Sequence, residues 1–259
     1  MTTTIFDDVS RWRAERLAQI RSGTTLGFVP TMGALHEGHV SLIRRSRAEN
    51  SRTLVSIFVN PAQFDDPRDL ANYPRPLEKD LALLEAEHAE LVLLPDQAQL
   101  YPDGYRYRVS ETQCSRTLEG AHRPGHFEGV LTVVLKLLQI AQAERAYFGE
   151  KDWQQLHLVR GMAEAFFLTT RIIGCPTVRE PDGLAVSSRN QRLSPRDRQQ
   201  APDFHRALSS SPSAGVAARA LERAGFAVDY VEDEDARRIG AVRLGGVRLI
   251  DNVPLGEPR

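Results

Sequence analysis

The sequence predicts an α/β fold, with a doubly wound parallel sheet followed by a small α+β C-terminal domain. The chain has 259 residues, of which 41% are hydrophobic, and this length suits one large domain with a smaller companion. Up to about residue 194, short apolar stretches alternate with stretches of helical periodicity. Strands separated by helices of this length pair in parallel, which favours a Rossmann-like sheet. We therefore predict a main domain at residues 1–194 and a second domain at residues 195–259.

The elements of the first half follow from the spacing of their apolar residues. Thr24–Val29 is a short apolar run typical of a strand, and a helix with one apolar and one arginine-rich face follows from Gly38. Leu54–Val59 is a second buried strand that ends at an Asn-Pro turn. Leucines at helical spacing predict a helix over Leu77–His88, and the apolar run Leu91–Leu94 predicts a third strand.

The second half continues this alternation before the composition changes. A helix is expected over Val130–Gln142, a strand over Arg145–Phe148, a helix from Lys151 or Asp152 to about residue 167, and a strand over Thr169–Ile173. Residues 195–259 are rich in Ser, Pro and Ala and end in an apolar stretch, which predicts a helix and a hairpin. The acidic run at residues 232–235 is expected to form a solvated turn.

Composition and charge exclude several classes of protein. The formal net charge of −1 gives no electrostatic footprint for nucleic acid, and no apolar run of about 18 residues is present that could span a membrane. The first residues show neither the charge order nor the apolar core of a signal peptide. Cys114 and Cys175 are too few for a disulfide framework and lack the spacing of metal ligands. We expect a soluble, cytoplasmic protein with no metal site of its own.

The unusual sequences of this chain fall at the predicted strand-to-helix turns, where ligands bind in doubly wound sheets. Neither a GxxxxGK[ST] loop, a GxGxxG turn nor a GxSxG elbow occurs. Instead, PTMGALHEGH at residues 30–39 follows the first strand. The imidazoles of His36 and His39 and the backbone N–H groups at the start of the helix suit a phosphate under nucleophilic attack, with Gly38 allowing close approach. The alternative is a pair of surface or capping histidines; the spacing is one residue short of a zinc-binding HExxH.

Four further turns carry polar groups of the same kind. GEKDWQQL at residues 149–156 offers the Lys151 ammonium to phosphate, although Asp152 alone also fits a simple helix cap. VSSRN at residues 186–190 combines serine hydroxyls with Arg189, whose guanidinium fits an oxyanion. NPAQF at residues 60–64 places neutral amides after the second strand. LEGAHRPGHFEG at residues 118–129 either binds an anion or is a structured connection.

Taken together and in order, these motifs identify a family. The chain resembles the pantothenate synthetases (pantoate–β-alanine ligases) in the segments PTMGALHEGH, SIFVNPAQFDDPRDLANYPR, LEGAHRPGHFEGV, GEKDWQQL and DGLAVSSRNQRL. The resemblance spans residues 24–200 and resumes in RLGGVRLIDN near the end. It places the chain in the HIGH-type nucleotidyltransferase superfamily, with HEGH and SSRN at the positions of the HIGH and KMSKS-type elements.

The resemblance implies the reaction and its site. Pantoate attacks the α-phosphate of ATP, with Mg²⁺ on the phosphates, and β-alanine then converts pantoyl adenylate to pantothenate for coenzyme A biosynthesis. His36, His39, Lys151 and Arg189 are the implied catalytic residues, and Gln63, Gln155, Asn60 and Arg123 the implied residues for pantoate and β-alanine. The implied ATP-binding residues are Met32, Gly33, Ala34, Leu35, His36, Glu37, Gly38, His39, Gly149, Glu150, Lys151, Asp152, Val178, Val186, Ser187, Ser188 and Arg189. Among partners, only these small molecules and a homodimer are expected.

The sequence departs from the family pattern in its C-terminal part. The region after Ser194 is expected to be shorter than the family's second domain, with part of a strand missing between Tyr230 and Ala241. Because this domain covers the site and excludes water, we hypothesise that the chain loses some adenylate to hydrolysis. Two rival hypotheses are another adenylate-forming enzyme of the superfamily and a nucleotide-binding protein without catalysis.

Overall fold

The computed structural model describes residues 3–234 and 236–256 and divides the chain into two compact units. The first unit comprises Met1–Gly149 and Gln154–Cys175, and the second comprises Glu150–Trp153 and Pro176–Arg259. The boundary expected after residue 194 therefore lies inside the second unit. Residues 176–194 cluster with the C-terminal strands, for example through an Arg179–Asp251 ion pair of 2.7 Å.

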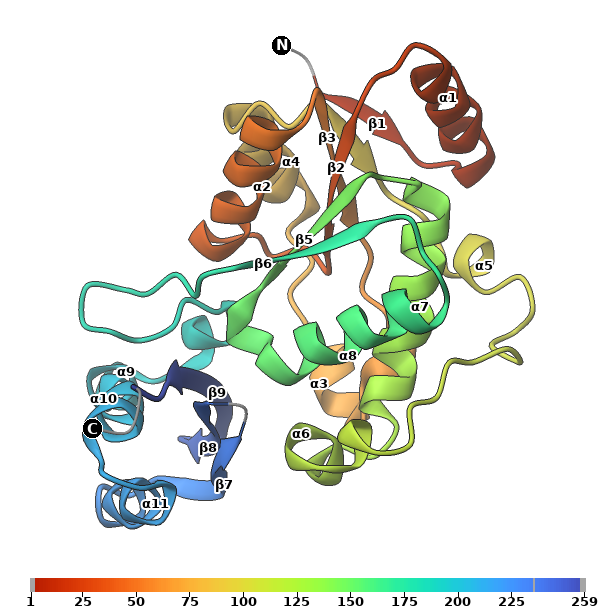
Figure 1. Ribbon diagram of the computed structural model, residues 1–259. Helices are drawn as coiled ribbons and strands as arrows, with labels where there is room; N and C mark the ends of the chain where they lie inside the picture. Colours follow the sequence, from red (N-terminus) through yellow and green to blue (C-terminus); the bar gives the residue numbers. More distant parts are fainter. Residues whose placement is uncertain (1–2, 235, 257–259) are drawn as a thin grey trace. The chain divides into compact units, whose positions relative to one another are not determined.

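The first unit is built on the predicted parallel sheet (Figure 1). All its strand pairs are parallel, in the order β1-β4-β3-β2-β5-β6. The chain steps from β2 outward to β3 and β4, then returns to place β5 on the other side of β2. The topological switch point therefore lies between β2 and β5, and ligands bind beyond the carboxyl ends of strands at such a point. The strands are β1 (Thr4–Phe6), β2 (Leu26–Thr31), β3 (Arg52–Ile57), β4 (Leu91–Leu93), β5 (Arg145–Gly149) and β6 (Arg171–Cys175).

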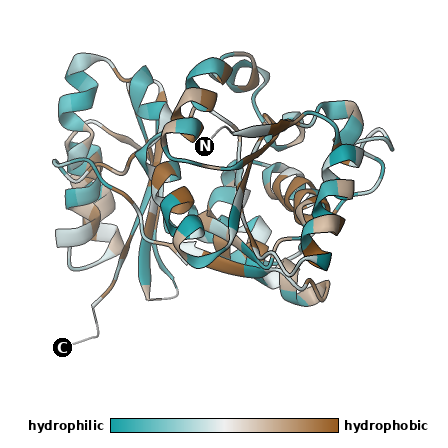
Figure 2. Cartoon of the chain, turned by 90° about the horizontal axis from the view of Figure 1, so that it is seen from above, coloured by the Kyte–Doolittle hydropathy of each residue, from teal (hydrophilic) through white to brown (hydrophobic). Residues whose placement is uncertain are grey.

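Helices cover both faces of this sheet, with α2 and α4 on one side and α1 and α7 on the other (Figure 1). Apolar side chains of α2 and α4 pack on β2, β3 and β4. Figure 2 colours the chain by hydropathy and shows hydrophobic stretches, in brown, in both helices and strands. None of the helices among the described residues has the length and hydropathy needed to cross a membrane. The helices are α1 (Val9–Arg21), α2 (Glu37–Glu49), α3 (Pro67–Ala71), α4 (Leu77–Ala86), α5 (Gln97–Leu100), α6 (Leu118–His122), α7 (His126–Ala141) and α8 (Trp153–Ala165), with short 3-10 turns η1 (Pro61–Gln63), η2 (Cys114–Arg116) and η3 (Glu150–Asp152).

The N-terminal strand and helix were not predicted from the sequence. Helix α1 begins after Asp8, whose carboxylate accepts the Arg11 N–H, and it buries Trp12 together with Arg16. The Arg16 guanidinium is 1% exposed and pairs with Glu144 at 2.7 Å. A buried arginine on the inner face breaks the apolar periodicity on which a prediction from sequence depends.

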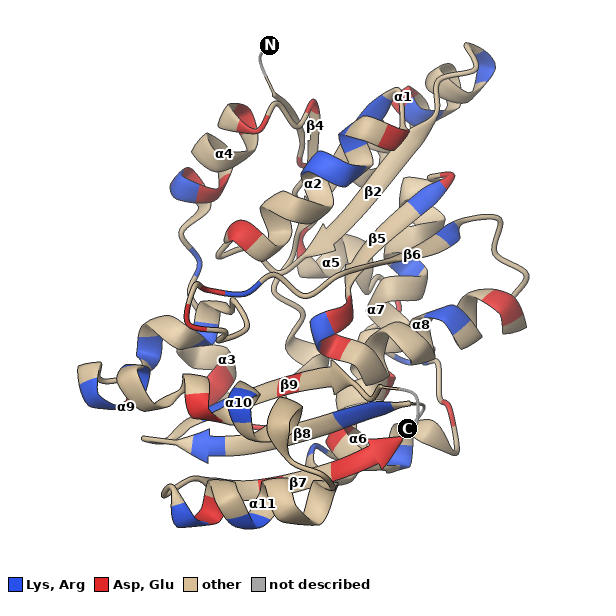
Figure 3. Ribbon diagram, turned by 60° about the vertical axis from the view of Figure 1, so that its left-hand side comes forward, with Lys and Arg blue, Asp and Glu red and all other residues tan. Residues whose placement is uncertain are grey.

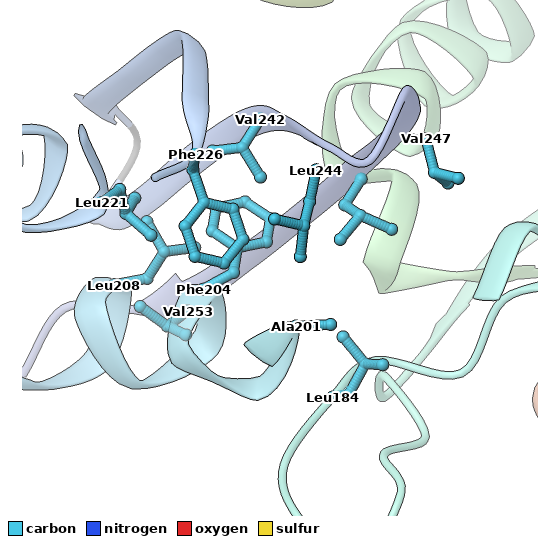
Figure 4. Packing of buried hydrophobic residues seen from close by; sticks show 11 residues of the cluster. Leu184, Ala201, Phe204, Leu208, Leu221, Phe226, Val242, Leu244, Val247 and Val253 are labelled. Atoms are coloured by element: carbon cyan, nitrogen blue, oxygen red, sulfur yellow. The ribbon is translucent and has the colours of Figure 1, made fainter. Parts of the chain in front are cut away.

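The second unit is an antiparallel sheet in the order β7-β8-β9, covered by helices. Phe204, Leu208, Leu221 and Phe226 meet side chains of the sheet in one apolar core (Figure 4). This arrangement agrees with the expected small α+β fold. Its elements are η4 (Ser188–Arg192), α9 (Pro195–Gln200), α10 (Pro202–Ser210), α11 (Ala214–Arg223), β7 (Ala227–Glu234), β8 (Arg237–Leu244) and β9 (Val247–Pro254).

Two expectations about this unit are wrong. No strand is lost between Tyr230 and Ala241, because these residues pair with each other in a continuous β7–β8 ladder with one bulge after Val228. Residues 232–234 of the acidic run lie in β7 rather than in a turn, and residue 235 lies outside the described residues. The strand is stabilised by Asp233, which pairs with Arg238 at 2.7 Å, and Figure 3 shows the acidic end of β7 beside the basic start of β8.

Candidate active site

The loop that follows β2 is held by a buried carboxylate. Asp80 of α4 is 3% exposed, and its two oxygens accept the backbone N–H groups of Ala34 and Leu35 at 2.8 and 2.7 Å. The loop turns through positive φ at Gly33 (78°) and Ala34 (50°). A Cβ at residue 33 would stand 2.9 Å from an Asp80 oxygen, so this position needs glycine for both reasons.

His36 and His39 form a reciprocal cap at the start of α2. His36 Nδ1 accepts the Gly38 N–H at 3.1 Å, and His39 Nδ1 accepts the His36 N–H at 3.3 Å. A ring nitrogen that accepts carries no proton, so the neutral form of each ring carries its proton on Nε2. The ring centroids are 4.1 Å apart. The structure therefore makes this pair both a helix cap and a pair of Nε2–H donors.

Gly38 and Glu37, between the two histidines, also make contacts close to their own helix. A Cβ at Gly38 would lie 2.9 Å from the His36 ring, so the cap itself favours glycine here, and close approach of a ligand stays a prediction. The Gly38 N–H donates to His36 Nδ1. The Glu37 carboxylate pairs with Arg44 at 2.9 Å and is 58% exposed.

Strand β3 is followed by a network of side-chain amides. Asn60 is 1% exposed, accepts the Tyr101 hydroxyl at 2.7 Å and donates to Gln63 Oε1 at 3.0 Å and to the Gly129 carbonyl at 3.2 Å. Gln63 Nε2 donates to Met32 Sδ at 3.1 Å. A thioether is a weak acceptor, so a substrate oxygen can replace it at little cost. Asn60 thus fixes the amide that Gln63 presents.

Arg123, which directly follows α6, and His126 of α7 support this turn. The Arg123 guanidinium pairs with Asp65 at 2.8 Å and with Glu119 at 3.3 Å, so two carboxylates already occupy it. His126 Nδ1 lies 2.7 Å from the Gln63 carbonyl, which only accepts, and His126 Nε2 lies 3.3 Å from Arg123 Nη1, which only donates. The imidazole is therefore neutral with its proton on Nδ1. Burial and the Arg123 charge lower the pKa of His126 to about 4.

Two consecutive glutamines on α8 have different surroundings. Gln154 is buried, accepts the Glu119 N–H at 3.0 Å and donates to the Cys114 and Thr117 carbonyls. Gln155 is half-buried, and its side-chain amide makes no hydrogen bond with the described residues. Gln155 is therefore the one with an amide available for a ligand.

The turn after β5 belongs to the second unit. Lys151 is half-buried and forms no ion pair within the described part of the chain, whereas the Glu150 carboxylate pairs with Arg237 at 3.0 Å. Ser187 and Arg189 line the same pocket as Lys151. Three of the predicted ATP-binding residues are thus brought together in the second unit.

The segment that contains Val178 and Val186 folds back on itself. The Val178 carbonyl accepts the Val186 N–H at 3.0 Å, and Ser187 Oγ accepts the Arg189 N–H at 3.3 Å at the start of η4. Arg179 is fixed by Asp251, which is 3% exposed. Burial alone would raise the pKa of Asp251, but His205 and Arg179 hold it below its ordinary value.

Sequence reasoning missed the residues that hold the loops, namely Asp80, Tyr101, Arg237 and Asn252. Asp80 occupies one polar position on an amphipathic helix, and nothing in its spacing distinguishes it from a solvated residue. Asn252 stands in the RLIDN segment, which belongs to the resemblance and was the one available signal.

Comparison with known proteins gives a consistent result. The sequence model of the family described as Pantoate-beta-alanine ligase matches residues 4–254. A pantothenate synthetase of Bdellovibrio bacteriovorus is 51% identical over 253 residues, which cover 98% of this chain and 100% of that protein. One of Coxiella burnetii is 47% identical over 257 residues, which cover 99% of each.

Solved structures are similar over nearly the whole chain. The pantoate-beta-alanine ligase of Francisella tularensis, complexed with beta-gamma ATP and beta-alanine, has a TM-score of 0.92 and 40% identity, and the match covers 97% of each chain. The pantothenate synthetase of Thermus thermophilus has a TM-score of 0.87 and 42% identity, with 97% of this chain and 99% of that one covered.

These relatives show no shortening of the C-terminal part. The chain covers 99–100% of the two curated proteins, so the expected loss of C-terminal residues does not hold against them. The hypothesis that some adenylate escapes to water stays a prediction, which the ratio of pantothenate formed to pyrophosphate released checks. By the extent of the family match and by these identities, the chain belongs to the pantoate-beta-alanine ligase family.

Proposed function

We propose that this chain condenses (R)-pantoate with β-alanine at the expense of ATP, giving pantothenate, AMP and pyrophosphate. The proposal rests on family membership and, within the structure, chiefly on the capped imidazole pair at the carboxyl end of β2. The Francisella tularensis relative holds an ATP analogue and β-alanine, two of the three substrates proposed here. As a member of this family the chain is a ligase that forms a C–N bond.

In the first step a pantoate carboxylate oxygen attacks the α-phosphorus of ATP, and the bond from that phosphorus to the bridging oxygen breaks to release pyrophosphate. Negative charge builds on the phosphate oxygens. His36 and His39 supply two Nε2–H donors whose direction is already fixed by the cap, so no reorganisation is needed. This makes electrostatic stabilisation their main role, with proton donation by His39 secondary.

The cationic groups of the proposal are those of Lys151 and Arg189. Lys151 and Arg189 are proposed to bind the phosphates, because ammonium and guanidinium suit a point charge and a bidentate contact respectively. Ser187 and Ser188 extend this set with hydroxyls, and Asp152 is proposed for the ribose. Val178 and Val186 are proposed to contact the nucleotide through their backbone.

Pantoate is proposed to bind through neutral amides. Gln63 exchanges its weak contact with the Met32 thioether for a pantoate oxygen, and Gln155 offers a second amide. Asn60 and Arg123 were predicted to bind substrate as well. Their side chains are already committed to protein partners, so we propose that they position Gln63.

In the second step the β-alanine amine attacks the acyl carbon of pantoyl adenylate. The C–N bond forms, the bond to the AMP oxygen breaks, and the amine gives up a proton. The developing charge again falls on a phosphate, so the His36 and His39 donors serve both steps. No covalent intermediate with the protein is required.

Magnesium is proposed to arrive with ATP. Mg²⁺ keeps several waters and usually binds through substrate phosphates with one or two carboxylates. Among the described residues no group of three or more His, Cys, Asp and Glu side chains is arranged to hold a metal ion. When bound, the cation neutralises phosphate charge. A homodimer and a cytoplasmic location stay predictions from the resemblance and the composition.

The decisive experiment is pantothenate synthesis by the purified protein from ATP, pantoate and β-alanine, with each substrate omitted in turn. We expect no product when any one is absent, and pantoate-dependent exchange of pyrophosphate into ATP. Exchange that depends on another carboxylic acid would instead indicate a different adenylate-forming enzyme.

Single substitutions separate catalysis from mere binding. His39→Ala or Lys151→Ala should lower the rate at least about a hundredfold if these groups stabilise the transition state. The control is Lys79→Ala, an exposed lysine on α4, which should leave the rate unchanged. A loss of less than a few-fold in the first two variants favours a nucleotide-binding protein without catalysis.

A further inference from the structure

Asn252 of β9 is joined by hydrogen bonds to the turn that carries Lys151. Its Nδ2 donates to the Glu150 carbonyl at 2.8 Å and to the Lys151 carbonyl at 3.0 Å. Its Oδ1 accepts from Arg237 Nη1 at 2.7 Å, and the residue is 2% exposed. Both amide hydrogens and the amide oxygen are thus used. An aspartate at this position would have the same size but no hydrogen to give to either carbonyl.

Arg237 contacts two side chains at the same turn. Its Nη2 donates to Glu150 Oε2 at 3.0 Å, and its guanidinium lies 3.9 Å from the centre of the Trp153 ring. The turn is therefore fixed by two carbonyls, one carboxylate and one ring. The Lys151 ammonium takes no part in this network and lines the pocket with Ser187 and Arg189.

The neighbouring residue ties in the other ATP-binding segment. The two carboxylate oxygens of Asp251 accept hydrogen bonds from Arg179 Nη1 and Nη2 at 2.7 and 3.0 Å. Asp251 Oδ1 also accepts the Asn252 N–H at 2.8 Å. Arg179 Nη2 donates in addition to the Asn252 carbonyl at 3.2 Å. Since Arg179 follows Val178 directly, the strand end holds both the Lys151 turn and the start of the segment that leads to Arg189.

We propose that Asn252 is a positioning residue that fixes the backbone of the Glu150–Asp152 turn and so presents the Lys151 ammonium to ATP. The inference rests on the proposed function. Its physical basis is that a catalytic group displaced by about 1 Å can lose on the order of a hundredfold in rate. Because Asn252 bonds to the carbonyls of the consecutive residues Glu150 and Lys151, the backbone of the turn is fixed and the Lys151 side chain can still change its rotamer.

A double-mutant cycle tests whether Asn252 acts through Lys151. The rate of pyrophosphate release is measured for the wild type, Asn252→Asp, Lys151→Ala and the double variant. We expect Asn252→Asp to lower kcat/KM for ATP at least about thirtyfold in the wild type but less than about threefold in Lys151→Ala. The two single variants should also divide their loss between kcat and KM in the same way.

A purely structural role predicts a different result. Asn252→Asp would then cost the same factor in both backgrounds, and a ratio of the two factors below about three overturns the proposal. If Asn252→Asp fails to fold by circular dichroism, the same cycle with Arg237→Lys decides, because this change removes the bidentate hold on Glu150 and Asn252. Arg243→Lys is the control, since Arg243 is on the same strand and 52% exposed. An inactive wild type would contradict the proposed function and not this inference.

Discussion

The neutral histidine behind the Gln63 turn makes the stability of the first unit depend on pH in a defined way. The pKa of His126 is about 4 in the folded protein against its ordinary 6.5. Above pH 6.5 the ring is neutral in both states, and its contribution to stability is complete. As the pH falls below 6.5 the unfolded chain takes up a proton that the folded protein refuses, so stability falls until about pH 4.

The size of this effect follows from the interval between the two pKa values. Each pH unit is worth about 1.4 kcal/mol, so the interval corresponds to about 3 kcal/mol. His126→Asn keeps a donor near the Gln63 carbonyl but cannot titrate. We expect it to lower the free energy of unfolding by about 1–2 kcal/mol at pH 7, through lost packing and the lost Arg123 contact. At pH 4 the variant should be the more stable protein.

Urea unfolding between pH 4 and pH 7.5, followed by tryptophan fluorescence, measures the effect. Trp12 is fully buried in the first unit, so a Trp153→Phe background limits the signal to that unit. His157→Asn, at an exposed position of α8, is the matched histidine control. Parallel curves for the wild type and His126→Asn across this range would refute the assignment of a neutral His126.

Three further predictions concern the loops around the site. Asp80→Asn places an amide hydrogen against one of two backbone N–H groups, and we expect kcat/KM for ATP to fall about tenfold and Tm to fall by about 5 °C. Gly129→Ala places a Cβ against the Ala62 carbonyl of η1, so urea unfolding should show a free energy of unfolding lower by about 2–4 kcal/mol. Gly161→Ala on α8 meets no such atom and should raise it by about 0.5–1 kcal/mol. Tyr101→Phe leaves the Asn60 oxygen one donor short, so initial-rate kinetics should show a several-fold rise in KM for pantoate with little change in kcat.

The parallel sheet was predictable because its strands are continuous apolar runs. Burial on both faces removes the alternation of a half-buried strand from β2 and β3, so their short length and flanking turn residues identify them, and the intervening helices require parallel pairing. The motif residues were predictable for a related reason, since they interrupt this regular pattern at strand ends. His36 and His39 stand out in the sequence because helix caps are more commonly made by Ser, Thr, Asp or Asn.

The residues that hold those motifs could not be found in the same way. Asp80, Arg237 and Asn252 act across sequence separations of 46, 87 and 102 residues, and one sequence contains no record of which distant groups meet. The contact of Gly38 with the His36 ring was not predicted either, because local spacing does not reveal how the ring is turned. The hairpin between Tyr230 and Ala241 was missed because charged residues on β7 hide its alternation.

The bonds between Asn252 and the Lys151 turn set an order of events during synthesis. The turn leaves the ribosome about a hundred residues before its partner on β9, since the two bonds span 101 and 102 residues. At about 5–20 residues per second, this is a delay of roughly 5–20 s. The bonds of the imidazole cap, by contrast, span two and three residues, and the loop before it is held by Asp80, 45 and 46 residues away. The turn that we propose presents Lys151 to ATP is therefore completed late, because a nascent chain that has not reached β9 lacks the Asn252 bonds that fix it.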